Sequence, residues 1–177
     1  KWTYDRQVVD KSGSWDNDNR IMNYTVILNP DGTDLVEGVD TLTLVDTMSY
    51  TNLVYLQWPF SGTYNIDATL IQSSVELFEA SWDETNGVWA AGAKVTGWSW
   101  TYAEKTGADD WNSNQATNTI TATGIPDGKK LMFKYTYRIS SNVPDEQDGK
   151  QVSFDLQFTN KAELEGTTHS DESSSSN

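Results

Sequence analysis

The stretch VSFDLQFTNKAEL at residues 152–164 decides the fold class. Its apolar side chains recur at every second position, which is the period of a half-buried β-strand. They are Val152, Phe154, Leu156, Phe158, Ala162 and Leu164, and polar residues occupy the positions between them. One polar residue, Asn160, falls in phase with the apolar set. We therefore expect an amide on the core side of this strand.

The same alternation recurs along the chain. In residues 41–48 the side chains of Leu42, Leu44 and Met48 share one face, and Asp46 falls in phase with them. Further strands are expected at residues 7–11, 21–29, 74–78, 89–91, 94–102, 119–123 and 131–139. Turn sequences such as Pro126-Asp127-Gly128 separate them, and no helical periodicity extends beyond a turn or two. The sequence predicts an all-β sandwich of two packed sheets with Greek-key-like connections.

Length and composition limit the domain count and the class of partner. The 177 residues fit one domain, which we expect to span residues 1–166. After Gly166 the chain becomes polar and Ser-rich, so residues 167–177 are expected to be a disordered tail or linker. A net charge of -14 repels phosphate backbones, which argues against a nucleic-acid partner.

The chain contains no cysteine, which rules out disulfides, thiolate metal sites and thiol nucleophiles. Its apolar runs, such as residues 53–56, are too short to cross a bilayer, and we expect no membrane contact by this domain. If the protein is secreted, its targeting and anchoring segments are expected to lie outside this sequence.

Three polar residues need an explanation, because an amide buried without a partner costs about 1–3 kcal/mol and a charge costs more. Asp46 and Asn160 lie in phase with core positions, and Lys11 lies in phase with Val9 at the end of the first expected strand, before the turn expected at Ser12 and Gly13. One interpretation is a set of satisfied polar groups or strand ends near solvent. The other is that the three side chains meet in the core.

If they meet, their chemistry is complementary. Burial lowers the pKa of a lysine and raises that of a carboxyl group, which favours a neutral amine and a protonated acid. The amine of Lys11 could attack the carboxamide carbon of Asn160. Protonated Asp46, hydrogen-bonded to the amide oxygen, would polarise the amide and transfer protons. Ammonia would leave, and an isopeptide bond would join the two strands.

Four stretches carry a resemblance to a known family: residues 11–15 (KSGSW), 21–30 (IMNYTVILNP), 42–48 (LTLVDTM) and 158–162 (FTNKA). They resemble the isopeptide-forming, immunoglobulin-like domains of Gram-positive surface adhesins and pilins, in the branch with the collagen-adhesin A-type fold. The resemblance covers roughly the first and last fifty residues. It implies an immunoglobulin-like sandwich in which Lys11 and Asn160 are cross-linked and Asp46 catalyses the single turnover.

The resemblance also implies a function. We expect a structural and adhesive domain of an extracellular, cell-wall-anchored bacterial surface protein, not an enzyme, and no cofactor. Its expected partners are neighbouring domains of the same protein and a host or surface ligand, either protein or glycan.

The region from about Trp58 to Trp111 departs from the family pattern and is long and Trp-rich, so an insertion or enlarged loops are expected there. Trp82, Trp89 and Trp111 offer an alternative function, because exposed aromatic faces beside carboxylates stack on sugars. The alternative is a noncatalytic carbohydrate-binding module. The competing structural interpretation places Trp98 and Trp100 in the core and the other tryptophans at sheet edges.

Other catalytic and metal sites find little support. Asp16-Asn17-Asp18-Asn19 offers oxygen ligands for calcium but lacks the following glycine and the distal glutamate, which favours a polar hairpin turn and no metal. His169 is the only histidine, so no Ser-His-Asp triad is expected. A glycosidase with paired carboxylates is a further alternative, but no spacing singles out two acids.

Overall fold

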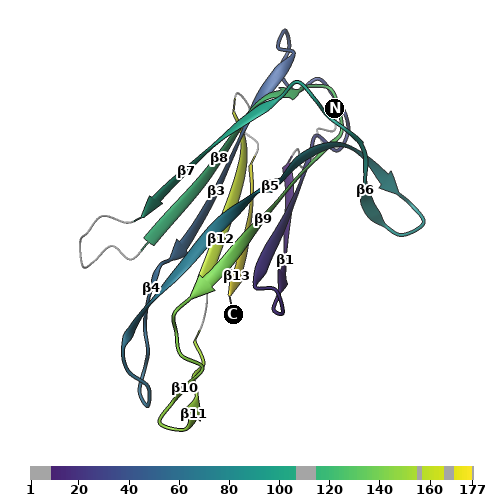
Figure 1. Ribbon diagram of the computed structural model, residues 1–177. Coiled ribbons are helices and arrows are strands. Elements are labelled where there is room, and N and C mark those ends of the chain that lie inside the picture. Colours follow the sequence, from purple (N-terminus) through teal and green to yellow (C-terminus); the bar gives the residue numbers. More distant parts are fainter. Residues whose placement is uncertain (1–8, 107–114, 155–156, 166–169, 177) are drawn as a thin grey trace, which may run out of the picture.

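The structure, a computed structural model, describes residues 9–106, 115–154, 157–165 and 170–176. Within them the chain forms two antiparallel sheets that enclose one core (Figure 1). The first sheet contains, in spatial order, β1 (Val9–Asp16), β2 (Ile21–Leu28), β9 (Leu131–Ser141), β5 (Thr63–Asp83) and β4 (Leu53–Tyr55), with β6 (Val88–Lys94) also paired to β5. The second contains β13 (Ser170–Ser176), β12 (Gln157–Glu165), β3 (Thr41–Thr51), β8 (Gln115–Pro126) and β7 (Ser99–Thr106). A short hairpin is formed by β10 (Glu146–Gln147) and β11 (Lys150–Gln151).

The connections confirm the expected all-β, immunoglobulin-like sandwich with Greek-key-like topology. After the β1–β2 hairpin the chain crosses to the second sheet for β3, returns for β4 to β6, and crosses again for β7 and β8. It then places β9 between β2 and β5, and β12 beside β3. Strands distant in sequence are therefore neighbours, and the first and last parts of the chain meet across the core (Figure 1).

The core is built from the alternation that the sequence predicts. On β3 every second side chain from Leu42 to Tyr50 is buried, and Asp46 is among them. On β12 the same holds from Phe158 to Leu164, with Asn160 among the buried residues. Both strands thus bury a polar side chain amid apolar neighbours, because the pleat leaves every second side chain on the same face.

The hairpin between β1 and β2 corrects one expected turn. The sequence predicts a turn after Lys11, whereas β1 continues through Gly13 to Asp16. The chain then reverses at a polar turn, where Asp16 Oδ1 accepts hydrogen bonds from the backbone N–H groups of Asp18 and Asn19 at 3.0 and 3.2 Å. This Asx turn confirms the hairpin interpretation of residues 16–19.

Gly13 has a packing role within β1. A Cβ atom at this position would lie 2.9 Å from the ring of Tyr24, its cross-strand partner on β2. Real Cβ atoms do not approach so closely, so glycine leaves the room that the tyrosine ring occupies.

The Trp-rich middle region, where an insertion or enlarged loops were expected, contains longer strands than the sequence predicts. β5 spans 21 residues, of which only 74–78 were predicted, and its pairing with β9 shifts register between Ile71 and Glu76. Its far end pairs with β6 in a ribbon that projects from the sandwich (Figure 1). Much of this ribbon is exposed on both faces, so it lacks the apolar alternation that identifies a half-buried strand.

The end of the chain also differs from expectation. The sequence predicts disorder from residue 167, but Ser170–Ser176 form β13 and pair antiparallel with β12. Backbone hydrogen bonds to the open edge of β12 hold this strand, and such pairing does not depend on apolar side chains. No helix among the described residues has the length and apolar character needed to span a membrane.

Candidate functional site

The structure brings the three candidate cross-link residues together in the core. Lys11 projects from β1 of the first sheet, and Asp46 and Asn160 project from β3 and β12 of the second. Asp46 and Asn160 are fully buried, and Lys11 is only 6% exposed. In the register of β3 and β12, Asn160 is paired with Met48 and lies diagonal to Asp46 on the same face. Neighbouring strands thus place the acid and the amide side by side.

A fourth residue, Tyr135 on β9, connects the other three. The hydroxyl of Tyr135 donates a hydrogen bond to Oδ1 of Asp46 at 2.6 Å and accepts one from Nδ2 of Asn160 at 2.8 Å. The ammonium group of Lys11 contacts both this hydroxyl and Oδ2 of Asp46. Donor and acceptor groups from both sheets therefore meet at one oxygen atom.

Tyr135 was missed as a site residue by sequence reasoning. Its alternation with Phe133 and Tyr137 correctly places it in the core, where all three are buried. The available signal was its hydroxyl, because a buried tyrosine usually needs a hydrogen-bond partner. Nothing in the sequence says which of the inward-facing tyrosines meets the buried aspartate.

Two aromatic rings contact the amine of the lysine. The amine nitrogen of Lys11 lies 5.1 Å from the ring centroids of both Tyr24 and Tyr135, within the range of a cation–π contact. The two rings stack on each other, with centroids 5.3 Å apart. Gly13, two residues after Lys11, leaves space for Tyr24. The ammonium group therefore lies beside the stacked pair, buried away from bulk water.

Burial controls the protonation of the site. The pKa of Asp46 is raised because its desolvated carboxylate is disfavoured, even though the charge of Lys11 and hydrogen bonds from Lys11, Tyr135 and Asn160 oppose the shift. The pKa of Tyr135 is also raised, first by burial and then by the negative charge of Asp46. Burial thus makes the Asp46 carboxylate a better proton acceptor than a solvated aspartate and disfavours ionisation of the Tyr135 phenol.

One expected contact takes another form. The mechanism expected from the sequence has Asp46 hydrogen-bonded to the amide oxygen of Asn160. In the described part of the chain, that oxygen (Oδ1) is buried without a hydrogen-bond partner. The amide instead directs Nδ2 to Tyr135. An unpartnered buried carbonyl costs about 1–3 kcal/mol, so Asn160 is poorly explained as a purely structural amide.

Of the candidate sugar-binding tryptophans, the structure describes Trp82 and Trp89. Trp82 and Trp89 face each other across the β5–β6 ribbon in an edge-to-face pair, with ring centroids 5.5 Å apart. Trp82 is 49% exposed, whereas Trp111 lies outside the described residues. Trp98 and Trp100 pack against the core, as the structural interpretation predicts. Trp58, in the loop between β4 and β5, is 91% exposed.

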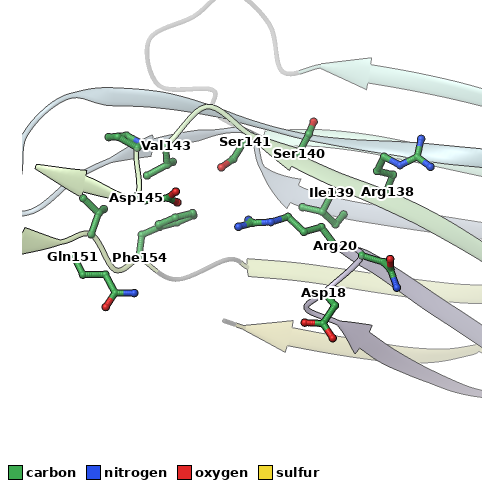
Figure 2. A pocket seen from close by; sticks show the side chains of 13 residues that line it. Asp18, Arg20, Arg138, Ile139, Ser140, Ser141, Val143, Asp145, Gln151 and Phe154 are labelled. Atoms are coloured by element: carbon green, nitrogen blue, oxygen red, sulfur yellow. The ribbon is translucent and has the colours of Figure 1, made fainter.

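A separate groove of about 770 Å³ lies beside the β1–β2 turn and the end of β9. Figure 2 shows Arg20 reaching toward Phe154 in this groove, whereas Arg138 turns away from it. None of Lys11, Asp46 and Asn160 lines the groove. Across the residues that the structure describes, no cluster of three or more His, Cys, Asp or Glu side chains could hold a metal ion.

Comparison with known proteins found two solved structures of low similarity. No family model and no curated protein matches the sequence. ACE19, the collagen binding subdomain of Enterococcus faecalis surface protein ACE, is 11% identical with a TM-score of 0.38 over 98% of this chain and 97% of its own. A structure of manganese lipoxygenase of Gaeumannomyces graminis with partial zonadhesin of Komagataella pastoris is 13% identical to this chain, with a TM-score of 0.42. The match covers 98% of this chain and 47% of that one. Similarities of this size carry no conclusion about ligand or activity.

Proposed function

We propose that this chain is a structural and adhesive domain of an extracellular bacterial surface protein, stabilised by an isopeptide bond between Lys11 and Asn160. Asp46 is the proposed acid and base for that single reaction. The observation that carries the proposal is the buried cluster itself: a lysine, an aspartate and an asparagine from three separate strands in one hydrogen-bonded group.

The energetics of the cluster favour a chemical role. A buried ion pair such as Lys11 with Asp46 is weak evidence for stability, because desolvation of both charges offsets much of their attraction. Apolar residues of similar volume would fill the same space with a comparable or better free energy of folding. A covalent bond formed by these side chains gives a reason for placing them in the core.

The proposed reaction needs no external reagent. Asp46 accepts one proton from the ammonium group of Lys11, and its raised pKa favours that transfer. The neutral amine then attacks Cγ of Asn160, a bond forms between Nζ and Cγ, and the bond between Cγ and Nδ2 breaks. Nδ2 leaves as ammonia with a second proton from the lysine nitrogen. The products are one amide, one ammonia and a protonated Asp46.

The mechanical consequence follows from the topology. The bond would join β1 of one sheet to β12 of the other, and would close a loop of about 150 residues. Force applied along the chain outside this loop would bypass the residues within it. A stalk or adhesin under shear benefits from that protection, in a chain that has no cysteine for a disulfide.

Intact mass tests the proposal. The purified domain is expected to be lighter than its calculated mass by one ammonia, and an Asp46→Ala variant is expected at its full calculated mass. A Lys134→Ala variant is the matched control, because Lys134 is an exposed lysine on β9, and it should lose ammonia like the wild type. A wild-type domain at full mass would refute the cross-link.

A further inference from the structure

One oxygen atom in the core is hydrogen-bonded to both nitrogen atoms that the proposed reaction exchanges. The hydroxyl of Tyr135 accepts from Nζ of Lys11, the entering nitrogen, and from Nδ2 of Asn160, the leaving nitrogen. It also donates to Asp46 at 2.6 Å. A group in this position can receive a proton from one nitrogen and supply a proton to the other.

We propose that Tyr135 is a catalytic residue, which carries the second lysine proton to the departing amide nitrogen. This inference rests on the proposed function, since it describes a step of the same reaction. It assigns separate tasks to the two acidic groups: Asp46 takes the first proton and keeps it, and Tyr135 passes on the second.

The step balances in atoms and charge. Once Nζ of Lys11 has bonded to Cγ, the tetrahedral centre carries a negatively charged oxygen, an excess proton on Nζ and a lone pair on Nδ2, and the oxygen re-forms the carbonyl when ammonia leaves. The Tyr135 hydroxyl gives its proton to Nδ2 and takes one from Nζ. The bond between Cγ and Nδ2 then breaks, ammonia departs, and the phenol is restored unchanged.

The surroundings of Tyr135 suit a relay that never holds charge. The residue is 1% exposed, so bulk water does not reach its hydroxyl to carry protons in its place. Burial and the neighbouring carboxylate raise the pKa of its phenol, which makes a lasting tyrosinate unfavourable. The hydroxyl must therefore take a proton from Nζ of Lys11 and give one to Nδ2 of Asn160 in one coupled step. That step requires contact with both nitrogens at once.

The neighbouring strand position provides a matched control. Tyr137 lies on the same face of β9, is fully buried, and has a ring centroid 5.8 Å from that of Tyr135. Among the described residues, its hydroxyl forms no hydrogen bond to Lys11, Asp46 or Asn160. Tyr135→Phe and Tyr137→Phe thus remove the same atom from equivalent core positions, but only the first removes a contact with the reacting nitrogens.

The experiment follows cross-link formation by intact mass at timed intervals after cell-free synthesis of the full chain. Wild type and Tyr137→Phe are expected to lose ammonia at similar rates, and Tyr135→Phe about 100-fold more slowly or not at all. Circular dichroism checks that each variant is folded. Ammonia loss from Tyr135→Phe within about threefold of the wild-type rate would overturn the relay and leave the cross-link intact, whereas no loss from the wild type would refute the proposed function itself.

A second measurement applies even if Tyr135→Phe does not fold. Ring-fluorinated tyrosine incorporated at position 135 keeps the ring and the hydroxyl but makes the phenol more acidic. The relay predicts that the rate of ammonia loss changes with this acidity, since the hydroxyl proton is in transit. A rate unaffected by fluorination would overturn the proposal, because a merely structural hydroxyl would tolerate the change.

Discussion

Replacement of Lys11 by methionine should greatly lower the stability of the domain. Lys11→Met retains a long side chain beside the stacked rings of Tyr24 and Tyr135 but removes the amine. The lost cross-link spans about 150 residues, and restriction of an unfolded loop of that length contributes about 5 kcal/mol. Loss of the partner of buried Asp46 adds to the effect, although protonation of the carboxyl group limits that addition.

Equilibrium unfolding in guanidinium chloride measures this difference. The free energy of unfolding of Lys11→Met should be lower than that of the wild type by about 5 kcal/mol or more. Its denaturant dependence should be steeper, because an uncross-linked unfolded chain exposes more surface. Lys134→Met, at an exposed position on β9, should change stability by less than about 0.5 kcal/mol. A loss below about 2 kcal/mol with an unchanged slope would refute the covalent account.

Three further predictions concern the surroundings of the site and the ribbon. Gly13→Ala should displace the ring of Tyr24, lower stability by about 1–3 kcal/mol and slow ammonia loss, as measured by denaturation and timed intact mass; a normal rate would show that the ring does not position Lys11. In Lys11→Met the free energy of unfolding should fall as the pH rises from about 4, by up to about 1.4 kcal/mol per pH unit relative to a variant that also carries Asp46→Asn. The reason is that burial raises the pKa of the Asp46 carboxyl group in the folded state, so this group ionises at lower pH in the unfolded chain. Equal pH profiles of the two variants would contradict this. Trp82→Ala should abolish the exciton signal of the indole pair in circular dichroism and cost about 0.5–1.5 kcal/mol; a glycan array signal lost in this variant would instead support sugar binding.

Residue alternation predicted the part of the fold that surrounds the site. On β3 and β12 the burial of every second side chain follows directly from the sequence, and so does the inward position of Asp46 and Asn160. The pattern is informative because each strand has one face on the core and one toward solvent, so a polar residue in the apolar phase stands out.

Other features carry no comparable sequence signal. The ribbon end of β5 lies outside the sandwich, where both faces meet water and alternation fades. β13 pairs through its backbone, for which a run of serines gives no signal. The role of Tyr135 depends on which tyrosine of β9 lies opposite Asp46 across the core, and that is set by how the two sheets are placed on each other. Local sequence does not encode that placement.

The most direct test of the cross-link is tryptic digestion followed by tandem mass spectrometry. Trypsin cannot cleave after an acylated Lys11, so we expect one branched peptide in which residues 7–20 are joined to residues 151–161 through Lys11 and Asn160. Its mass should be one ammonia less than the sum of the two linear peptides. Recovery of residues 7–11, 12–20 and 151–161 as separate peptides of full calculated mass would contradict it.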